Sequence, residues 1–229
     1  MDGTLNENDL SRVVNADKAH VWHHLVQHKP FETSDPRIII EGKGMRVWDQ
    51  NGKEYIDAVS GAVWTVNVGY GRERIANAVR DQLIKLNYFA GSAGSIPGSI
   101  FAEKLIEKMP GMSRVYYTNS GSEATLHALR LCRAASGRDK VIRFFGHFHG
   151  YHEFTFVAGH PPADQMQASP PFRESAGIPE ALAELIITVE YNNADALEAA
   201  IRAHAHEAGT LLIEPVDFNC GCILPEPGF

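Results

Sequence analysis

Cysteine is scarce in this chain of 229 residues, which contains only Cys132, Cys220 and Cys222. Three thiols cannot all pair, so the composition disfavours a disulfide-stapled scaffold and favours a reducing compartment such as the cytoplasm. No apolar run approaches the roughly 20 residues that a membrane-spanning helix requires, and the polar start Met1–Thr4 does not resemble a signal peptide. We therefore expect a cytoplasmic protein that does not enter a membrane.

Positive charge is also in deficit, because 21 Lys and Arg residues face 28 Asp and Glu residues and leave a formal net charge of −7. This acidic balance disfavours a broad nucleic-acid interface, so no nucleic-acid partner is expected. Core-forming residues are not in short supply, since 44% of the chain is hydrophobic and 9% is aromatic. That composition excludes general disorder and is sufficient for a well-buried core.

Residues 1–60 are expected to form an N-terminal helix followed by a β-meander. His20, His24 and His28 recur every four residues and would share one face of a helix. The plainer interpretation is a set of polar histidines near a helix surface, and a metal site is the alternative. The strands of the meander are predicted at residues 38–41, 45–49 and 54–57. The Asn51–Gly52 pair predicts a type I′ turn between the last two strands.

Residues 61–229 have the pattern of an α/β domain. Helices are predicted at residues 72–85, 100–109, 122–135 and 195–208. Strands are predicted at residues 115–118, 141–144, 186–189 and 211–213. This alternation predicts a mostly parallel sheet with helices on both faces. The segment Leu211–Ile213 is apolar throughout, which is typical of a strand buried on both faces of such a sheet.

The segment Thr118–Ala124 lies between a predicted strand and a predicted helix. Ser120 and Glu123 have the spacing of a capping box, which fixes the start of a helix. Gly121 allows a tight turn, and the free N–H groups of the first helical turn, together with the Ser122 hydroxyl, would bind a phosphate. An ordinary capped helix without a ligand is the alternative interpretation.

Two further segments follow predicted strands, where ligands bind in open α/β sheets. In Phe145–His152, Phe148 and His149 stand between two glycines and would suit a flat, conjugated ligand. Zinc binding by His147, His149 and His152 is a weaker alternative, because cysteine ligands at zinc-site spacing are lacking. The second segment places Glu214 directly after the last predicted strand, and the nearby Cys220–Cys222 pair fits two buried or inert thiols better than a metal half-site.

Taken together, these three segments resemble the class III aminotransferases, which are pyridoxal-phosphate enzymes of fold type I. The segments at residues 60–71 and 88–94 are similar to the taurine–pyruvate aminotransferase branch. The segments at residues 124–131, 146–150 and 221–229 are more similar to the glutamate-1-semialdehyde aminomutase branch. The resemblance implies that residues 61–229 are an incomplete cofactor-binding large domain of fold type I, preceded by the N-terminal helix and β-meander.

The resemblance also implies roles for individual residues. Ser120, Gly121 and Ser122 match the phosphate-binding turn. Phe148 matches an aromatic residue, more often Tyr in the family, that stacks on the pyridine ring, and His149 belongs to the same motif. The remaining matches are Glu214, a carboxylate beside the active site, and Trp64 and Phe89, which belong to the substrate pocket.

The implied reaction transfers an amino group from an ω-amine or amino acid to a keto acid such as pyruvate, with pyridoxal 5′-phosphate as cofactor. The lysine that holds the cofactor as a Schiff base, and the aspartate that pairs with its ring nitrogen, are expected C-terminal to the position of Phe229. Family members are homodimers, so a homodimer or larger assembly is expected. The alternatives are a non-catalytic, cofactor-binding or dimerising remnant and an α/β module for another phosphorylated ligand.

Overall fold

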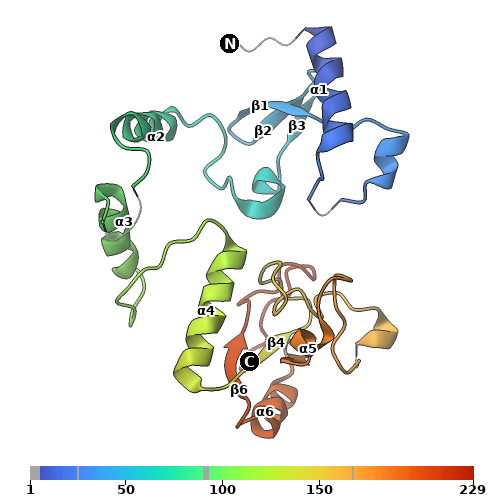
Figure 1. The fold of residues 1–229 in the computed structure, drawn as a ribbon, viewed down its shortest axis with the longest axis vertical. Coiled ribbons are helices and arrows are strands. Elements are labelled where there is room, and N and C mark those ends of the chain that lie inside the picture. Colours follow the sequence, from blue (N-terminus) through green and yellow to red (C-terminus); the bar gives the residue numbers. More distant parts are fainter. Residues whose placement is uncertain (1–5, 25, 90–92, 167) are drawn as a thin grey trace. The chain divides into compact units, whose positions relative to one another are not determined.

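The computed structural model describes residues 6–24, 26–89, 93–166 and 168–229. Its contacts divide the chain into two compact units, Met1–Ser99 and Ile100–Phe229 (Figure 1). The division at residue 60 that the sequence predicts is based on a change in sequence motifs and not on contacts, and it stays a prediction.

The N-terminal unit begins with helix α1 (Glu7–His20), which is capped by the Asn6 side chain accepting the Asp9 N–H. The helix ends at His20, so the expected stripe of His20, His24 and His28 on one helical face is wrong. Instead, the His28 Nε2 accepts the backbone N–H of His23 at 2.9 Å. No group of three metal-ligating side chains occurs among the described residues.

The predicted β-meander is confirmed as an antiparallel sheet of β1 (Ile39–Lys43), β2 (Arg46–Asp49) and β3 (Glu54–Ile56). The predicted type I′ turn is wrong, because Gly52 has a positive φ of 75° and Asn51 does not. The Asp49 carboxylate accepts the N–H groups of Asn51 and Lys53 and the Tyr55 hydroxyl. These bonds stabilise a three-residue turn with glycine in the left-handed position.

The rest of this unit consists of an irregular turn at Ser60–Trp64, helix α2 (Glu73–Lys85) and the start of helix α3 (Ile96–Ile106). Both helices lie close to their predicted positions. Residues 90–92, within the segment that resembles the taurine–pyruvate aminotransferase branch, lie outside the described residues.

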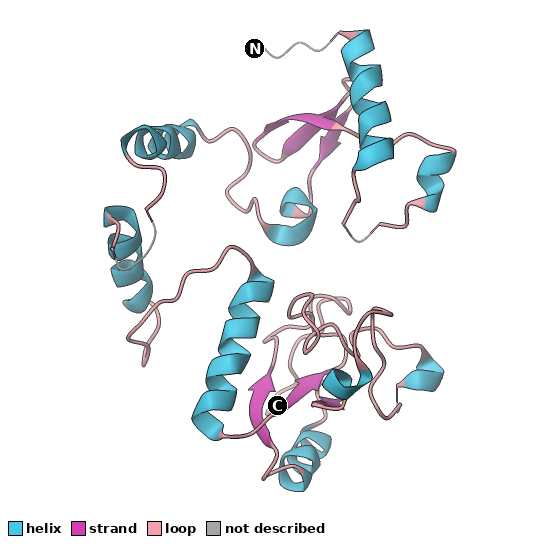
Figure 2. Cartoon of the chain, in the orientation of Figure 1, coloured by secondary structure: helices cyan, strands magenta, loops and turns pink. Residues whose placement is uncertain are grey.

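The elements of the C-terminal unit are α4 (Gly121–Ser136), β4 (Lys140–Phe144), α5 (Glu180–Ala183), β5 (Ile186–Val189), α6 (Ala194–Ala203) and β6 (Ala208–Leu212). Its strands form a three-stranded parallel sheet with the order β5-β4-β6. Figure 2 shows strands of this unit in magenta and its helices in cyan. The fold class predicted from the sequence is therefore confirmed. No described helix has both the length and the apolar character needed to cross a membrane.

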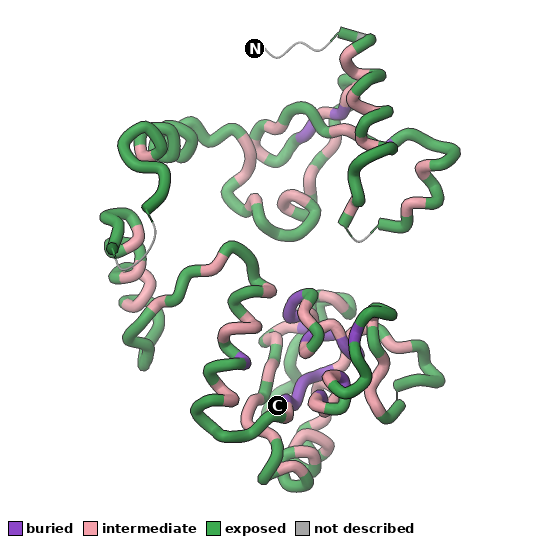
Figure 3. Tube along the Cα trace, in the orientation of Figure 1, coloured by how far each residue is buried: buried purple, intermediate pink, exposed green. Residues whose placement is uncertain are grey.

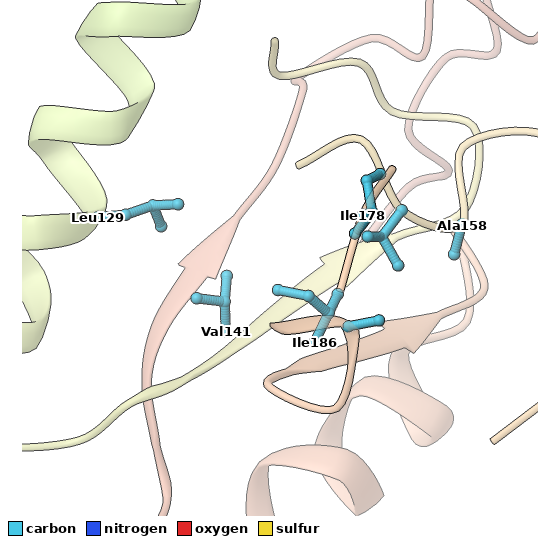
Figure 4. Packing of buried hydrophobic residues seen from close by; sticks show 7 residues of the cluster. Leu129, Val141, Ala158, Ile178 and Ile186 are labelled. Atoms are coloured by element: carbon cyan, nitrogen blue, oxygen red, sulfur yellow. The ribbon is translucent and has the colours of Figure 1, made fainter. Parts of the chain in front are cut away.

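Alternating side chains of β4 build a core on each face of this sheet. Val141 belongs to the cluster that includes Leu129 of α4 and Ile186 of β5 (Figure 4). Ile142 and Phe144 belong to the opposite cluster, which includes residues of α6. Because successive side chains of a strand point to opposite faces, one apolar strand holds a helix on each side. The buried residues of this unit accordingly gather around β4 (Figure 3).

One strand prediction is wrong at the border of this sheet, and a second strand is present but is less buried than predicted, since β6 includes Leu211 and Leu212 and ends before Ile213. Residues 115–118 form no strand, since none of the described strands pairs with them, and the Tyr116 side chain is 74% exposed. Leu211 and Ile213 are each 43% exposed rather than buried on both faces. The reason is the strand order: β6 pairs on one side only, with β4, and its other edge is open.

Leu129→Ala should destabilise the C-terminal unit by about 2–5 kcal/mol, because Leu129 is 1% exposed and its loss leaves a cavity between α4 and the sheet. Leu131→Ala, on the same helix at a position that is 71% exposed, is the matched control and should change stability by less than about 0.5 kcal/mol. Urea unfolding followed by circular dichroism measures both. Equal effects of the two substitutions would contradict the packing described here.

Candidate cofactor site

The N-terminus of α4 offers free hydrogen-bond donors. Ser120 is the N-cap residue, and its Oγ accepts the Glu123 N–H at 3.2 Å, while Glu123 Oε2 accepts the Asn119 N–H at 2.7 Å. These two bonds form the expected capping box, except that the Glu123 side chain accepts the N–H of Asn119 instead of the N–H of the N-cap residue Ser120. The N–H groups of Gly121 and Ser122 have no acceptor in the described part of the chain. Two donors and the positive end of the helix dipole therefore remain for an anion.

The space around Gly121 fits a phosphate group. A Cβ atom built at Gly121 would have no heavy atom within 4 Å, and the residue does not have a positive φ. The fold of this chain therefore does not require glycine there, although glycine in a helix carries an entropic cost. Open space beside unpaired N–H groups is what a phosphate-binding turn needs, so these residues fit the implied cofactor at its phosphate end.

The loop Gly146–His152 lies against this helix start. A Cβ atom at Gly150, where φ is 116°, would lie 2.8 Å from Ser122 Cα, so the close approach requires glycine. Ser122 Oγ accepts the Tyr151 N–H at 3.1 Å, which leaves the hydroxyl proton of Ser122 available to an anion. The first two motif segments, which are far apart in the sequence, thus form one site.

Glu214, which follows β6, joins the third motif segment to the same loop. Its Oε1 accepts the backbone N–H of Phe148 and, at 3.3 Å, the Asn219 amide. Its own N–H is donated to His147 Nδ1 at 3.0 Å. Burial raises the pKa of Glu214, although the bond from Phe148 opposes this shift. The Glu214 side chain therefore holds the backbone of Phe148, the residue whose ring is expected from the resemblance to stack on the pyridine ring of the cofactor.

His147 and His149 are both buried and both neutral. Burial lowers the pKa of His149 to about 3, with a further contribution from the charge of Arg143, and burial also lowers the pKa of His147. Since His147 Nδ1 accepts an N–H, its proton lies on Nε2. The Nε2 atoms of both rings have no partner within the described residues. The described residues hold no metal-ligating group of three, so zinc binding by His147, His149 and His152 has no support here.

Trp64 and Phe89 belong to the N-terminal unit, where they are 54% and 68% exposed. Trp64 stands in the irregular turn Ser60–Trp64 and has a positive φ of 59°. That turn is held by Asp57, which accepts the Gly61 N–H at 2.6 Å and the Tyr70 hydroxyl at 2.7 Å. Both aromatic side chains are accessible to a ligand, and their substrate-pocket role stays a prediction.

Sequence reasoning missed Thr125 and Arg143, which both hold the loop Gly146–His152. The Thr125 hydroxyl donates to His149 O at 2.6 Å, and the fully buried Arg143 guanidinium donates to His147 O. No motif marks Thr125. Arg143 carried a signal, since it is the one charged residue between apolar neighbours in Val141–Phe145.

A large cavity lies away from this site. It has a volume of about 1090 Å³ and runs along β5, lined by Lys140, Ile186, Thr188 and residues 168–171 among others. None of the motif residues Ser122, Phe148 or Glu214 lines it. Hydrogen-bond donors that converge at the start of α4, together with buried polar groups, define the candidate site, and cavity size does not.

Comparison with known proteins identifies the family. The family model described as aminotransferase class-III matches residues 30–229. A hypotaurine/taurine–pyruvate aminotransferase from Paracoccus denitrificans is 47% identical over 98% of this chain and 51% of its own length. A glutamate-1-semialdehyde 2,1-aminomutase from Syntrophus aciditrophicus is 35% identical over 85% of this chain and 43% of its own length.

Solved structures agree with this assignment. An omega-transaminase from Sphaerobacter thermophilus matches with a TM-score of 0.79 and 26% identity, over 95% of this chain and 49% of that one. An omega-transaminase from Pseudomonas jessenii, determined in complex with PMP, matches with a TM-score of 0.76 and 26% identity, over 93% of this chain and 51% of that one. This chain belongs to the class III aminotransferases, as its sequence motifs indicate, and it spans about half the length of these relatives.

His149→Gln should reduce the pH dependence of folding stability. The pKa of His149 is about 3 in the folded chain, against about 6.5 for a histidine in an unfolded chain. As the pH falls, His149 therefore takes up a proton in the unfolded state before it does so in the folded state. The contribution of neutral His149 is complete above about pH 6.5 and is lost progressively toward pH 3, at up to about 1.4 kcal/mol per pH unit.

Urea unfolding of each variant at about pH 7 and about pH 5 measures this effect. The loss of stability between the two pH values should be smaller for His149→Gln than for the unaltered chain. It should not vanish, because burial also lowers the pKa of His147 and His152. His206→Gln, which removes an exposed histidine after α6, is the matched control. If His149→Gln and His206→Gln both behaved like the unaltered chain, His149 would not be a buried neutral group.

Proposed function

We propose that this chain forms the phosphate-binding and ring-stacking part of an aminotransferase site for pyridoxal 5′-phosphate. The observation that carries the proposal is the meeting of three separate motif segments at the N-terminus of α4. Ser120, Gly121 and Ser122 form the start of the helix, and Phe148 and His149 belong to the adjoining loop. Glu214, which follows β6, accepts the Phe148 N–H and so connects this loop to the end of β6.

The phosphate would be held by the free N–H groups of Gly121 and Ser122 and by the Ser122 hydroxyl. All three donors lie at the positive end of the α4 dipole, where a dianion is favoured. The Glu123 carboxylate, which would otherwise compete for the same donors, is engaged with the Asn119 N–H. The helix start therefore offers donors to a ligand without a rival anion from its own side chain.

The ring would be held by Phe148, whose aromatic face suits a flat pyridine. Bound pyridoxal phosphate supplies the electron sink on which amino-group transfer depends. Neutral His149 adds no positive charge next to the ring, and Glu214 keeps the Phe148 backbone in place. The resemblance matches the family's lysine and ring-nitrogen aspartate to no residue of this chain, so none is proposed as the reacting amine.

The proposed substrates are an ω-amine donor, of which taurine is the first candidate, and a keto acid such as pyruvate as acceptor. The support is the similarity to two proteins named as taurine–pyruvate aminotransferases, at 47% and 42% identity over nearly the whole of this chain. The aminomutase relatives are less similar, at 35% and 32% identity. Transfer between two molecules is therefore favoured over an internal amino exchange.

We also propose that the protein is a cytoplasmic homodimer or larger homo-oligomer. The cytoplasm is supported by the unpaired state of Cys132, Cys220 and Cys222. Self-association is supported by α2, where Ile75, Val79 and Leu83 recur at helical spacing and are each about half exposed. An apolar stripe of this kind is typical of an interface between protein chains.

Titration with pyridoxal phosphate, followed by absorbance, tests the cofactor site. Gly121→Asp should raise the dissociation constant about tenfold or more, because a carboxylate beside the cradle repels the phosphate dianion. The same variant should retain the fold, since an acidic residue is favourable in a first helical turn. Gly177→Asp adds the same charge at a loop glycine with equally open surroundings and should bind normally. Identical affinities for the two variants would remove Gly121 from the site.

Light scattering tests the assembly. The unaltered chain should show at least twice the chain mass of 25.2 kDa. Val79→Glu, which places a charge in the apolar stripe of α2, should lower the mass, whereas Asn77→Glu on the same helix should not. A single 25.2 kDa species at high concentration would contradict the proposed dimer.

A further inference from the structure

Side chains from outside the loop between β4 and residue 152 hold much of its backbone, while the N–H groups of Phe145 and Gly146 donate to the backbone carbonyls of Val189 and Gly159. Five consecutive residues, His147 to Tyr151, each have one backbone group bonded to such a side chain. Three of these groups are carbonyls that accept a bond: His147 O from the Arg143 guanidinium, His149 O from the Thr125 hydroxyl and Gly150 O from the Thr155 hydroxyl. The other two are N–H groups, of which Phe148 N–H donates to the Glu214 carboxylate and Tyr151 N–H donates to Ser122 Oγ. Loop backbone groups usually bond to water or to neighbouring backbone, so this capture by side chains of separate elements is specific to the site.

Arg143 is the centre of this arrangement. Its side chain is fully buried in β4 and donates to three carbonyl groups, those of His147, Thr155 and Val157. A buried charge is costly unless its donors find acceptors. Both terminal nitrogens of the Arg143 guanidinium donate to these carbonyls, whereas its Nε has no partner within the described residues. The segment from 147 to 157 is therefore held in its path over β4, because a path that removed these carbonyls would leave further donors unpaired.

Thr125 fixes the peptide that joins the two motif side chains. Its Oγ1 lies 2.6 Å from His149 O and 3.1 Å from the carbonyls of Gly121 and Ser122. A hydroxyl has one proton, and the shortest contact identifies His149 O as the acceptor. His152 Nε2 lies 3.1 Å from Thr125 Oγ1 and then donates to this hydroxyl oxygen. The threonine proton is thus committed to the loop and is not available to a ligand.

We infer that Thr125 and Arg143 are positioning residues that set the orientation of Phe148 and His149 for the cofactor ring and leave phosphate binding unaffected. This inference rests on the proposed function and extends it to two residues that no motif singles out. Two of the three proposed phosphate donors are N–H groups fixed by α4 itself, and the third, the Ser122 hydroxyl, belongs to the same helix although it accepts the Tyr151 N–H. The ring end, by contrast, depends on a loop that these side chains hold. Pre-organising that loop before binding removes an ordering cost that the ligand would otherwise meet.

The test compares two ligands on matched variants. Thr125→Val keeps the shape of the side chain and removes the bond to His149 O, while Thr125→Ser keeps the bond. Thr210→Val is the control, because its hydroxyl is buried in β6 and has no partner within the described residues. For Thr125→Val the dissociation constant for pyridoxal phosphate should rise about fivefold, and that for inorganic phosphate should stay unchanged. Thr125→Ser and Thr210→Val should match the unaltered chain with both ligands.

A second readout does not depend on any ligand. Hydrogen exchange of the peptide that contains residues 146–157 should be about fivefold faster in Thr125→Val, while peptides from β5 and α6 keep their rates. Arg143→Lys should give the same two results, since a single ammonium group cannot satisfy three carbonyls at once. This substitution carries a greater risk of unfolding, so the conclusion depends on the Thr125 series.

Three outcomes with Thr125→Val would overturn the inference. Equal loss of phosphate and pyridoxal phosphate binding in Thr125→Val would show that Thr125 supports the cradle instead of the ring. Faster exchange with unchanged pyridoxal phosphate affinity would show that the loop does not position the ring. Unchanged exchange and unchanged affinity would show that the bond to His149 O has no effect. If the unaltered chain binds phosphate but not pyridoxal phosphate, the proposed function itself fails, and the inference fails with it.

Discussion

The buried charge of Arg143 links the core of the C-terminal unit to its candidate site. A guanidinium in the middle of an apolar parallel strand is costly unless its donors find acceptors. The acceptors are carbonyl groups of the segment that follows β4, so the strand and this segment form their structure together. The site loop is therefore part of the folded core, although Phe148 within it is partly accessible. The same charge also helps to keep the neighbouring His149 neutral.

The parallel sheet explains why motifs distant in sequence meet. Loop 146–152 follows β4 and Glu214 follows β6, and adjacent parallel strands end at the same edge of a sheet. The third component, the start of α4, reaches that edge because α4 packs on the sheet through Leu129. Topology brings the three segments close, and specific bonds such as those of Glu214 and Ser122 then set their register.

Local signals predicted much of the local structure, and several of the failures concern features that depend on a distant partner. The capping box at Ser120 and the strand at 141–144 were predictable because they are encoded within a few residues. Residues 115–118 have a strand-like sequence, but a strand exists only with a neighbour to pair with. The histidine stripe failed because periodicity alone does not show that α1 ends at His20. Thr125 could not be found at all, since its role depends on a tertiary contact 24 residues away.

Two glycines of the site show how structural and functional requirements can be separated. Gly150 is required by the fold, because its φ of 116° and its distance to Ser122 leave no room for a Cβ atom. Gly121 is not required by the fold, since a Cβ atom there would meet nothing within 4 Å. The open space at Gly121 lies beside the two N–H groups that have no acceptor among the described residues, so it leaves them accessible to the phosphate group proposed above.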